Sequence, residues 1–148
     1  MKVVKYLKPS RIVLGMKAED KWQAIEELLD VLISDGVVAD RERALADLVA
    51  REKRVSTGME HGLALPHAKT GAVGDLVVAM GVVPDGIDFD SLDGEPARVI
   101  FLVLSRINTS GPHIECIAEI ARAYSSSGVR DGLVAAGSVN DVLELLKR

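Results

Sequence analysis

The feature that most constrains the fold is an apolar segment that ends in a proline and a histidine, Gly-Leu-Ala-Leu-Pro-His from Gly62 to His67. Pro66 fixes its own φ and restricts Leu65 to an extended conformation, so we expect a strand over residues 63–65. A proline has no N–H to donate to a neighbouring strand, which places this strand end at an edge or mouth of a sheet. The sequence therefore predicts an accessible His67 at a strand end. The alternative at this point is a structural histidine.

Composition limits the class of protein. With 148 residues, 48% of them hydrophobic and 27% charged, the chain is expected to form one domain over residues 1–148. The net charge of −4 and the lack of a basic stripe argue against a general nucleic-acid or acidic-membrane binder. The only cysteine is Cys116, so an intrachain disulfide is excluded.

The sequence also gives an expectation for the compartment. No signal-peptide stretch is seen at the N-terminus, and the longest aliphatic and aromatic run, residues 99–104, is too short to span a bilayer. We therefore expect a cytosolic protein that meets a membrane only through a partner.

Two helices are predicted before the central segment. Asp20 and Gln23 have the spacing of a capping box, and the helix they begin should end at Gly36. Its expected buried stripe is Trp22, Ile25, Leu28, Leu29, Leu32 and Ile33. Asp40 is expected to cap a second helix, which buries Ala44, Leu45, Leu48 and Val49.

Arg51 falls on the inward stripe of that second helix. It lies three residues after Leu48, a spacing that predicts an inward charge in need of a partner. The alternative is that Arg51, with Lys53 and Arg54, complements the negative C-terminal end of the helix dipole.

Further strands are expected at residues 11–14, 76–83 and 99–104, and the last of them should be central because it is fully apolar. Turns are predicted at residues 84–86 and 93–96.

Gly111-Pro112 should open a helix, with proline in a favoured first-turn position. Its expected buried stripe is Ile114, Ile117, Ala118, Ile120, Ala121 and Tyr124. Two short helices should follow residues 125–128, the second beginning at Ser138.

His113 falls in the first turn of the Gly111-Pro112 helix. Free backbone N–H groups and the positive dipole end favour an anion there, and they disfavour an imidazolium. A neutral histidine beside a phosphate fits this place, and a histidine of no consequence is the alternative.

Cys116 is expected to be a small buried side chain. No nucleotide-binding glycine loop or zinc-protease motif occurs, and a zinc site formed by His61, His67, His113 and Cys116 is a distant alternative.

Together these residues resemble a known family. The matching positions are Arg51-Glu52, Ser56-Thr57-Gly58, the segment 62–67, Gly86-Ile87-Asp88-Phe89, Leu92-Asp93-Gly94 and His113. The chain resembles enzyme IIA of the fructose/mannitol type, from the bacterial phosphotransferase system, including its nitrogen-regulatory branch. The resemblance implies an α/β domain with a mixed parallel/antiparallel sheet flanked by helices on both faces.

The resemblance also implies a function. His67 would accept a phosphoryl group from a histidine-containing phosphocarrier protein and pass it to an enzyme IIB, which acts with a membrane-bound enzyme IIC. Arg51 and His113 would serve the transfer, Arg51 and Thr57 would contact the phosphoryl group, and His61 is given no role. No metal or nucleotide cofactor is required. Free imidazoles ionise at around pH 6–7, so the contribution of His113 is expected to change there. A regulatory paralogue, which controls other proteins through its phosphorylation state, is the alternative.

Overall fold

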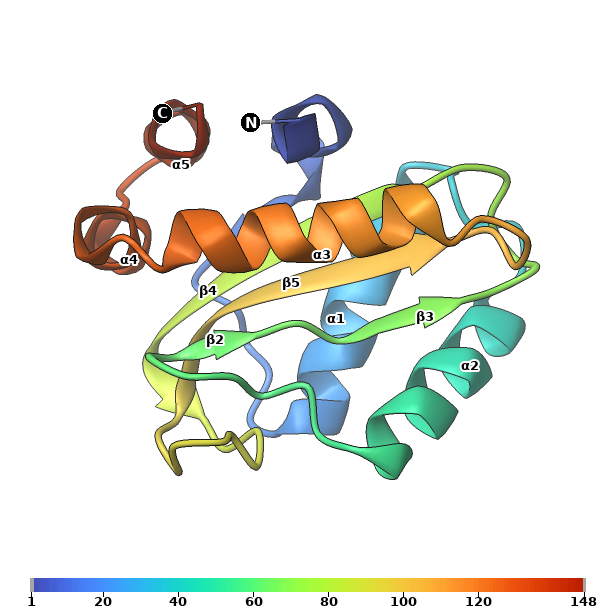
Figure 1. Ribbon diagram of the computed structural model, residues 1–148, viewed down its shortest axis with the longest axis horizontal. Helices are drawn as coiled ribbons and strands as arrows, with labels where there is room; N and C mark the ends of the chain where they lie inside the picture. The colour runs from blue at the N-terminus through green and yellow to red at the C-terminus, as the bar shows by residue number, and fades with distance from the viewer. Residues whose placement is uncertain (1, 148) are drawn as a thin grey trace.

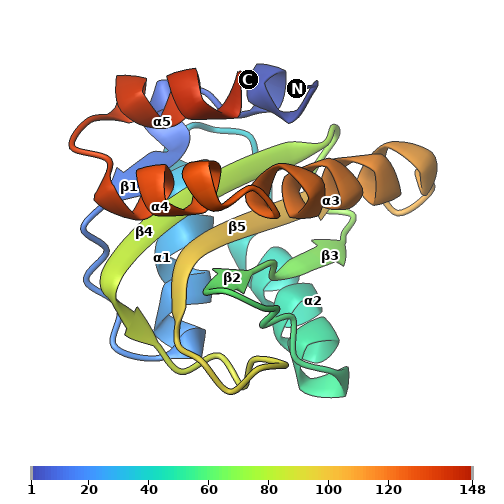
Figure 2. The same ribbon diagram turned by 60° about the vertical axis from the view of Figure 1, so that its left-hand side comes forward.

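The computed structural model describes residues 2–147 and consists of a central sheet between two layers of helices (Figure 1). One face of the sheet is covered by α1 (Lys21–Ser34) and α2 (Arg41–Arg54). The other face is covered by α3 (Gly111–Tyr124), α4 (Ser127–Ala135), α5 (Val139–Leu146) and the short N-terminal 3-10 helix η1 (Lys2–Tyr6). Figure 2 shows the same arrangement turned by 60° about the vertical axis. No helix among residues 2–147 has the length and apolar character needed to cross a membrane.

The sheet has five strands and mixed directions. They are β1 (Ile12–Leu14), β2 (Leu63–Ala64), β3 (His67–Lys69), β4 (Val77–Ile87) and β5 (Ala97–Ser105). A 3-10 turn, η2 (Pro9–Arg11), precedes β1. The strand order is β1-β4-β5-β2, with β3 also pairing with β5. Among the pairs formed by these five strands within residues 2–147, β4–β5 is antiparallel and the others are parallel. The predicted mixed sheet with helices on both faces is confirmed, and the apolar strand β5 is central as expected.

Local capping explains where the helices begin. The Asp20 carboxylate accepts the N–H of Gln23 at 2.8 Å, and the Gln23 side chain in turn accepts the N–H of Glu19 at 3.0 Å. The predicted capping box therefore forms, except that the Gln23 side chain binds the N–H of Glu19, the residue before the cap, in place of the N–H of Asp20. Asp40 and Ser138 cap α2 and α5 as predicted. Gly36 follows the end of α1 with a φ of 74°, a conformation that glycine adopts without steric cost.

The turn predicted at residues 84–86 is wrong. These residues continue β4, and the strand pairing shifts register between Val82 and Ile87. A β-bulge at this point tolerates Pro84, which has no N–H to donate to the ladder. Gly86 adopts a φ of 83°, and a Cβ there would lie 2.6 Å from the Pro96 ring. The chain reverses over residues 88–96 instead.

Two predicted buried stripes begin one residue too late. Trp22 is 38% exposed and Ile114 is 64% exposed, whereas Lys21 and His113 are buried in their place. Lys21 lies four residues before Ile25 and seven before Leu28, which places it in the middle of the buried face of α1, whereas Trp22 lies at the edge of that face. In α3 the buried face likewise includes His113 and leaves out Ile114; its buried residues are His113, Cys116, Ile120 and Tyr124.

Candidate active site

The edge of the sheet is built around Pro66. Strands β2 and β3 pair with the same side of β5 and in one register, with Leu63 opposite Val99 and His67 opposite Val103. They form one edge strand that is interrupted at Leu65-Pro66. His67 therefore lies at a strand end as predicted, and this end is the start of β3, a short strand that the sequence did not predict. The edge position itself is confirmed.

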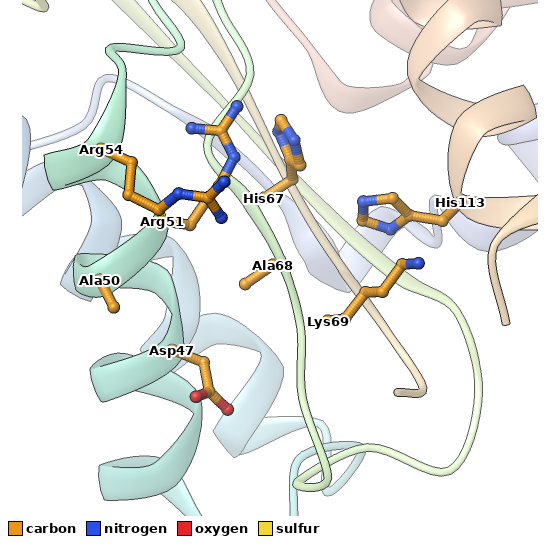
Figure 3. A pocket seen from close by; sticks show the side chains of 8 residues that line it. All are labelled: Asp47, Ala50, Arg51, Arg54, His67, Ala68, Lys69 and His113. Carbon is orange, nitrogen blue, oxygen red and sulfur yellow. The ribbon is translucent and has the colours of Figure 1, made fainter. Parts of the chain in front are cut away.

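The free side of this edge is covered only in part. Residues 57–59 run along β2, where Leu65 donates its N–H to the carbonyl of Thr57 at 3.1 Å. Beyond Pro66, β3 faces α2, and the gap between them is a pocket of about 360 Å³. Figure 3 shows the side chains that line it: Asp47, Ala50, Arg51, Arg54, His67, Ala68, Lys69 and His113.

His67 is half-buried in this pocket, and its ring is fixed by its own backbone. Its Nδ1 lies 2.6 Å from the carbonyl oxygen of Leu65. A carbonyl can only accept, so Nδ1 carries the hydrogen and donates, which leaves the lone pair on Nε2. Burial, with a contribution from the nearby Arg51 charge, lowers the pKa of His67 below its ordinary value. At neutral pH the ring therefore presents a neutral, nucleophilic Nε2.

His113 reaches the same pocket from the first turn of α3. Its ring centroid lies 5.3 Å from that of His67, with a tilt of 58° between the two planes. Its Nδ1 forms a hydrogen bond with the hydroxyl of Ser105, at the end of β5. Burial lowers the pKa of His113 to about 4, with further contributions from His67, Lys69 and Arg51. The ionisation expected around pH 6–7 is therefore moved to more acidic pH in the structure.

Three cationic side chains surround the two histidines. Arg51 and Arg54 project from α2, and Lys69 projects from β3 (Figure 3). Arg51 also donates from Nη1 to the carbonyl of Val55 at 2.9 Å, so it both lines the pocket and satisfies the end of α2. The Lys69 ammonium donates to the Ser110 hydroxyl at 2.8 Å. Such a pocket favours a multiply charged anion.

Sequence reasoning missed two of these cations. Lys69 lies two residues after His67 and therefore on the same face of the strand. This two-residue spacing was the signal in the sequence that could have placed Lys69 beside His67. Arg54 was considered only as a helix-end charge. It lies three residues after Arg51, close to one helical turn, which places both guanidinium groups on the pocket side of α2.

The charge that continues the inward stripe of α2 is Glu52. Glu52 is buried, four residues after Leu48, whereas Arg51 is only half-buried beside it. The Glu52 carboxylate accepts the N–H of Thr57 at 2.8 Å and the Thr57 hydroxyl at 2.6 Å. It also pairs with the Lys21 ammonium at 3.1 Å. The Thr57 hydroxyl is thus engaged with Glu52 and is not among the groups that line the pocket.

The four candidate zinc ligands do not converge. His67 and His113 share the pocket, but His61 and Cys116 each line a different depression of the surface. Within residues 2–147 the structure places no group of three or more His, Cys, Asp or Glu side chains where they could hold a metal ion.

The fold and the pocket agree with a family assignment. Residues 5–148 match the family model described as "Phosphoenolpyruvate-dependent sugar phosphotransferase system, EIIA 2". The chain belongs to the PTS EIIA type 2 family. It is a phosphoryl-transfer component of this phosphotransferase family, and the roles of its individual side chains stay predictions.

Relatives of this EIIA protein include both stand-alone and multidomain proteins. This chain is 37% identical over 126 residues to the fructose-specific EIIA component of Haloferax volcanii, and the match covers 85% of this chain and 82% of that protein. It is 30% identical over 148 residues to the fructose-specific EIIABC component of Bacillus subtilis. That match covers 100% of this chain and only 23% of the longer protein.

Solved EIIA structures share the fold. The nitrogen regulatory protein IIA-Ntr of Neisseria meningitidis matches with a TM-score of 0.86 at 30% identity, over 99% of both chains. The complex of Escherichia coli IIA-Mtl with phosphorylated IIB-Mtl contains a chain that matches with a TM-score of 0.81 at 28% identity, over 95% of this chain and 98% of that chain.

The buried His113 predicts a pH dependence of stability. Its pKa is about 4 in the folded protein and near 6.5 when it is exposed, so the unfolded chain binds a proton more readily. Stability is therefore lost as pH falls from 6.5 towards 4. We expect the free energy of unfolding to fall more steeply in this range for wild type than for His113→Gln, by roughly 1–2 kcal/mol after allowance for solvent screening. Urea denaturation of both proteins at several pH values tests this, and parallel pH profiles would contradict it.

Proposed function

We propose that this EIIA protein is a phosphohistidine carrier that accepts a phosphoryl group on Nε2 of His67 from a histidine-containing phosphocarrier protein. The group is then passed to an enzyme IIB. The observation that carries the proposal is the orientation of His67. Its Nδ1 is occupied by the Leu65 carbonyl, so its free nitrogen is the one available in a cation-lined pocket.

The transfer needs no external base. The Nε2 lone pair of neutral His67 attacks phosphorus, while the bond from phosphorus to the donor's ring nitrogen breaks and its electron pair stays on that nitrogen. The donor ring carries a hydrogen on its other nitrogen and so leaves as a neutral imidazole, and its positive charge passes to the His67 ring. The hydrogen on Nδ1 remains in its hydrogen bond to Leu65 throughout. Phosphorylated His67 reverses these steps when it meets an enzyme IIB, so positioning and electrostatics supply the catalysis.

The cations stabilise the charge in transfer. Arg51 offers a planar fork of N–H donors, of which one already binds Val55, and the rest are available for phosphoryl oxygens. Arg54, on the same helix as Arg51, and Lys69, on β3, add positive charge to the pocket wall. Asp47 is the one carboxylate among the lining residues, and it pairs with Arg43 at 3.5 Å.

Arg51→Ala is expected to slow phosphoryl transfer about tenfold to a hundredfold, because the loss of one charge-assisted contact costs roughly 1.5–3 kcal/mol. Arg51→Lys should recover only part of the rate, since a point charge cannot hold two oxygens at once. The measurement is single-turnover transfer from the phosphorylated carrier protein. Lys53→Ala is the matched control, because it removes an exposed charge of α2 that does not line the pocket. Wild-type rates for Arg51→Ala would leave Arg51 as a helix-end charge only.

A role in sugar transport is the first candidate, supported by the 37% identity to a fructose-specific EIIA component. A nitrogen-type regulatory role is the second, favoured by the TM-score of 0.86 to IIA-Ntr. Deletion of the gene separates them. Transport predicts loss of growth on one phosphotransferase sugar and restoration by the wild-type gene, whereas regulation predicts normal growth on such sugars with an altered response to the nitrogen source.

The biochemical test of the proposal is transfer in two steps. Phosphorylated carrier protein should label this protein, and the isolated labelled protein should then pass the phosphoryl group to an enzyme IIB encoded in the same genome. Absence of labelling by the cognate carrier would overturn the carrier function. Labelling without transfer to any cognate IIB would favour the regulatory candidate.

A further inference from the structure

The two pocket histidines have different hydrogen-bond partners. His67 meets a backbone carbonyl, which can only accept a hydrogen bond. His113 meets the hydroxyl of Ser105, which can donate or accept. The direction of the second hydrogen bond therefore decides which nitrogen of His113 carries the hydrogen.

The surroundings of Ser105 decide that direction. Ser105 is 1% exposed. Among the hydrogen bonds formed by residues 2–147, His113 Nδ1 is the one partner found for its hydroxyl. If the hydroxyl accepted from Nδ1, its own O–H would be buried without an acceptor, which costs more than an unused lone pair. The O–H of Ser105 therefore donates to Nδ1.

The consequence is a hydrogen on the opposite nitrogen of His113. A neutral imidazole carries one hydrogen, so a His113 that accepts at Nδ1 carries its hydrogen at Nε2. The two rings, whose centroids are 5.3 Å apart, then differ in role. His67 presents a lone pair, and His113 presents an N–H.

We propose that Ser105 is a positioning residue that holds His113 in the Nε2–H tautomer, so that a neutral His113 donates a hydrogen bond to the phosphoryl group on His67. The proposal rests on the proposed carrier function. It explains how a buried, uncharged histidine can serve an anion. A tautomer with the lone pair on Nε2 would direct that lone pair at the phosphoryl oxygens and repel them.

The position of Ser105 suits this role. It is the last residue of β5, where its carbonyl accepts the N–H of Thr70 at 2.9 Å. Its backbone is thus fixed by the same sheet that carries His67. Because β3 pairs with β5 through His67 opposite Val103 and Lys69 opposite Ser105, both histidine rings are oriented from adjacent strands.

The first test reads the tautomers directly. In the unphosphorylated wild-type protein at neutral pH, two-bond 15N–1H spectra of the histidine rings should show the hydrogen on Nδ1 of His67 and on Nε2 of His113. A hydrogen on Nδ1 of His113 would overturn the proposal. This measurement requires neither a variant nor phosphorylation, so it stands apart from the carrier function.

The second test uses variants. Ser105→Ala should populate both tautomers of His113 and slow single-turnover transfer from phosphorylated protein to IIB about fivefold to tenfold, as expected for one lost hydrogen bond. Ser105→Thr keeps the hydroxyl and should restore both properties. Thr70→Val is the matched control. It removes a buried hydroxyl beside Ser105 that bonds Ala72, not His113, and it should leave the His113 tautomer and the transfer rate as in wild type.

The outcomes separate the two proposals. A wild-type tautomer and transfer rate in Ser105→Ala would overturn the role of Ser105, and so would equal losses in Ser105→Ala and Thr70→Val. Wild-type protein that accepts no phosphoryl group would overturn the carrier function, whereas phosphorylated wild type with His113 in the Nδ1–H tautomer would overturn only the inference made here.

Discussion

His67→Gln is expected to take up no phosphoryl group from the phosphorylated carrier protein, whereas wild type should become labelled with an acid-labile, alkali-stable phosphate. The reason is that the amide of glutamine is not a nucleophile towards phosphorus, and no other free imidazole nitrogen has the same place in the pocket. The measurement is incorporation of label from phosphoenolpyruvate through enzyme I and the carrier. This is the largest effect predicted for any single substitution.

The other two histidines supply matched controls for His67→Gln. His113→Gln should still be labelled, at a lower rate, because it loses one donor and keeps the nucleophile. His61→Gln should be labelled at the wild-type rate, since His61 is exposed and lines a different depression, beside Tyr124. Undiminished labelling of His67→Gln would show that His67 is not the acceptor.

Glu52→Ala is expected to lower the free energy of unfolding by about 3–5 kcal/mol, the largest loss of stability predicted for this protein. Glu52 is 4% exposed and neutralises the buried Lys21 ammonium, whose other carboxylate partner, Asp90, is largely exposed. Its removal leaves Lys21 with that weaker partner, and it removes the acceptor for two hydrogen bonds from Thr57. Urea denaturation gives the measurement.

A double-mutant cycle separates the ion pair from simple loss of packing. Lys21→Met combined with Glu52→Ala should cost less than the sum of the two single changes, by about 1–3 kcal/mol, because no unpaired ammonium remains. Glu42→Ala, an exposed change in the first turn of the same helix, should cost less than about 1 kcal/mol. A Glu52→Ala protein as stable as the Glu42→Ala protein would contradict this account of the network.

The parts of the structure that the sequence predicted correctly are those governed by local rules. Asp20, Asp40 and Ser138 cap helices because each cap involves a residue only three positions away. The edge position of His67 was predicted because Pro66 acts on its immediate neighbours. The continuous apolar run of β5 indicated a central strand, because a strand buried on both faces shows no alternation of apolar and polar residues.

The parts that the sequence did not predict depend on contacts between distant elements. Lys21 and Glu52 are separated by 31 positions, and each was overlooked because a charged residue on an apolar stripe resembles a surface residue until its partner is known. The contact between Ser105 and His113 joins the end of β5 to α3 across a loop. Pro84 and Gly86 have the composition of a turn, but the register of β4 against β5 keeps them in the strand. In these cases tertiary pairing overrides local propensity.

The central claim is that Nε2 of His67 carries the phosphoryl group. The most direct measurement is NMR of wild-type protein with 15N-labelled histidine, phosphorylated by the carrier protein and kept at alkaline pH, in which coupling to phosphorus identifies the ring and the nitrogen. We predict that the phosphorus couples to Nε2 of His67 and that Nδ1 of the same ring carries no phosphorus. Phosphorus bound to Nδ1 of His67, or to the ring of His61 or His113, would contradict the account.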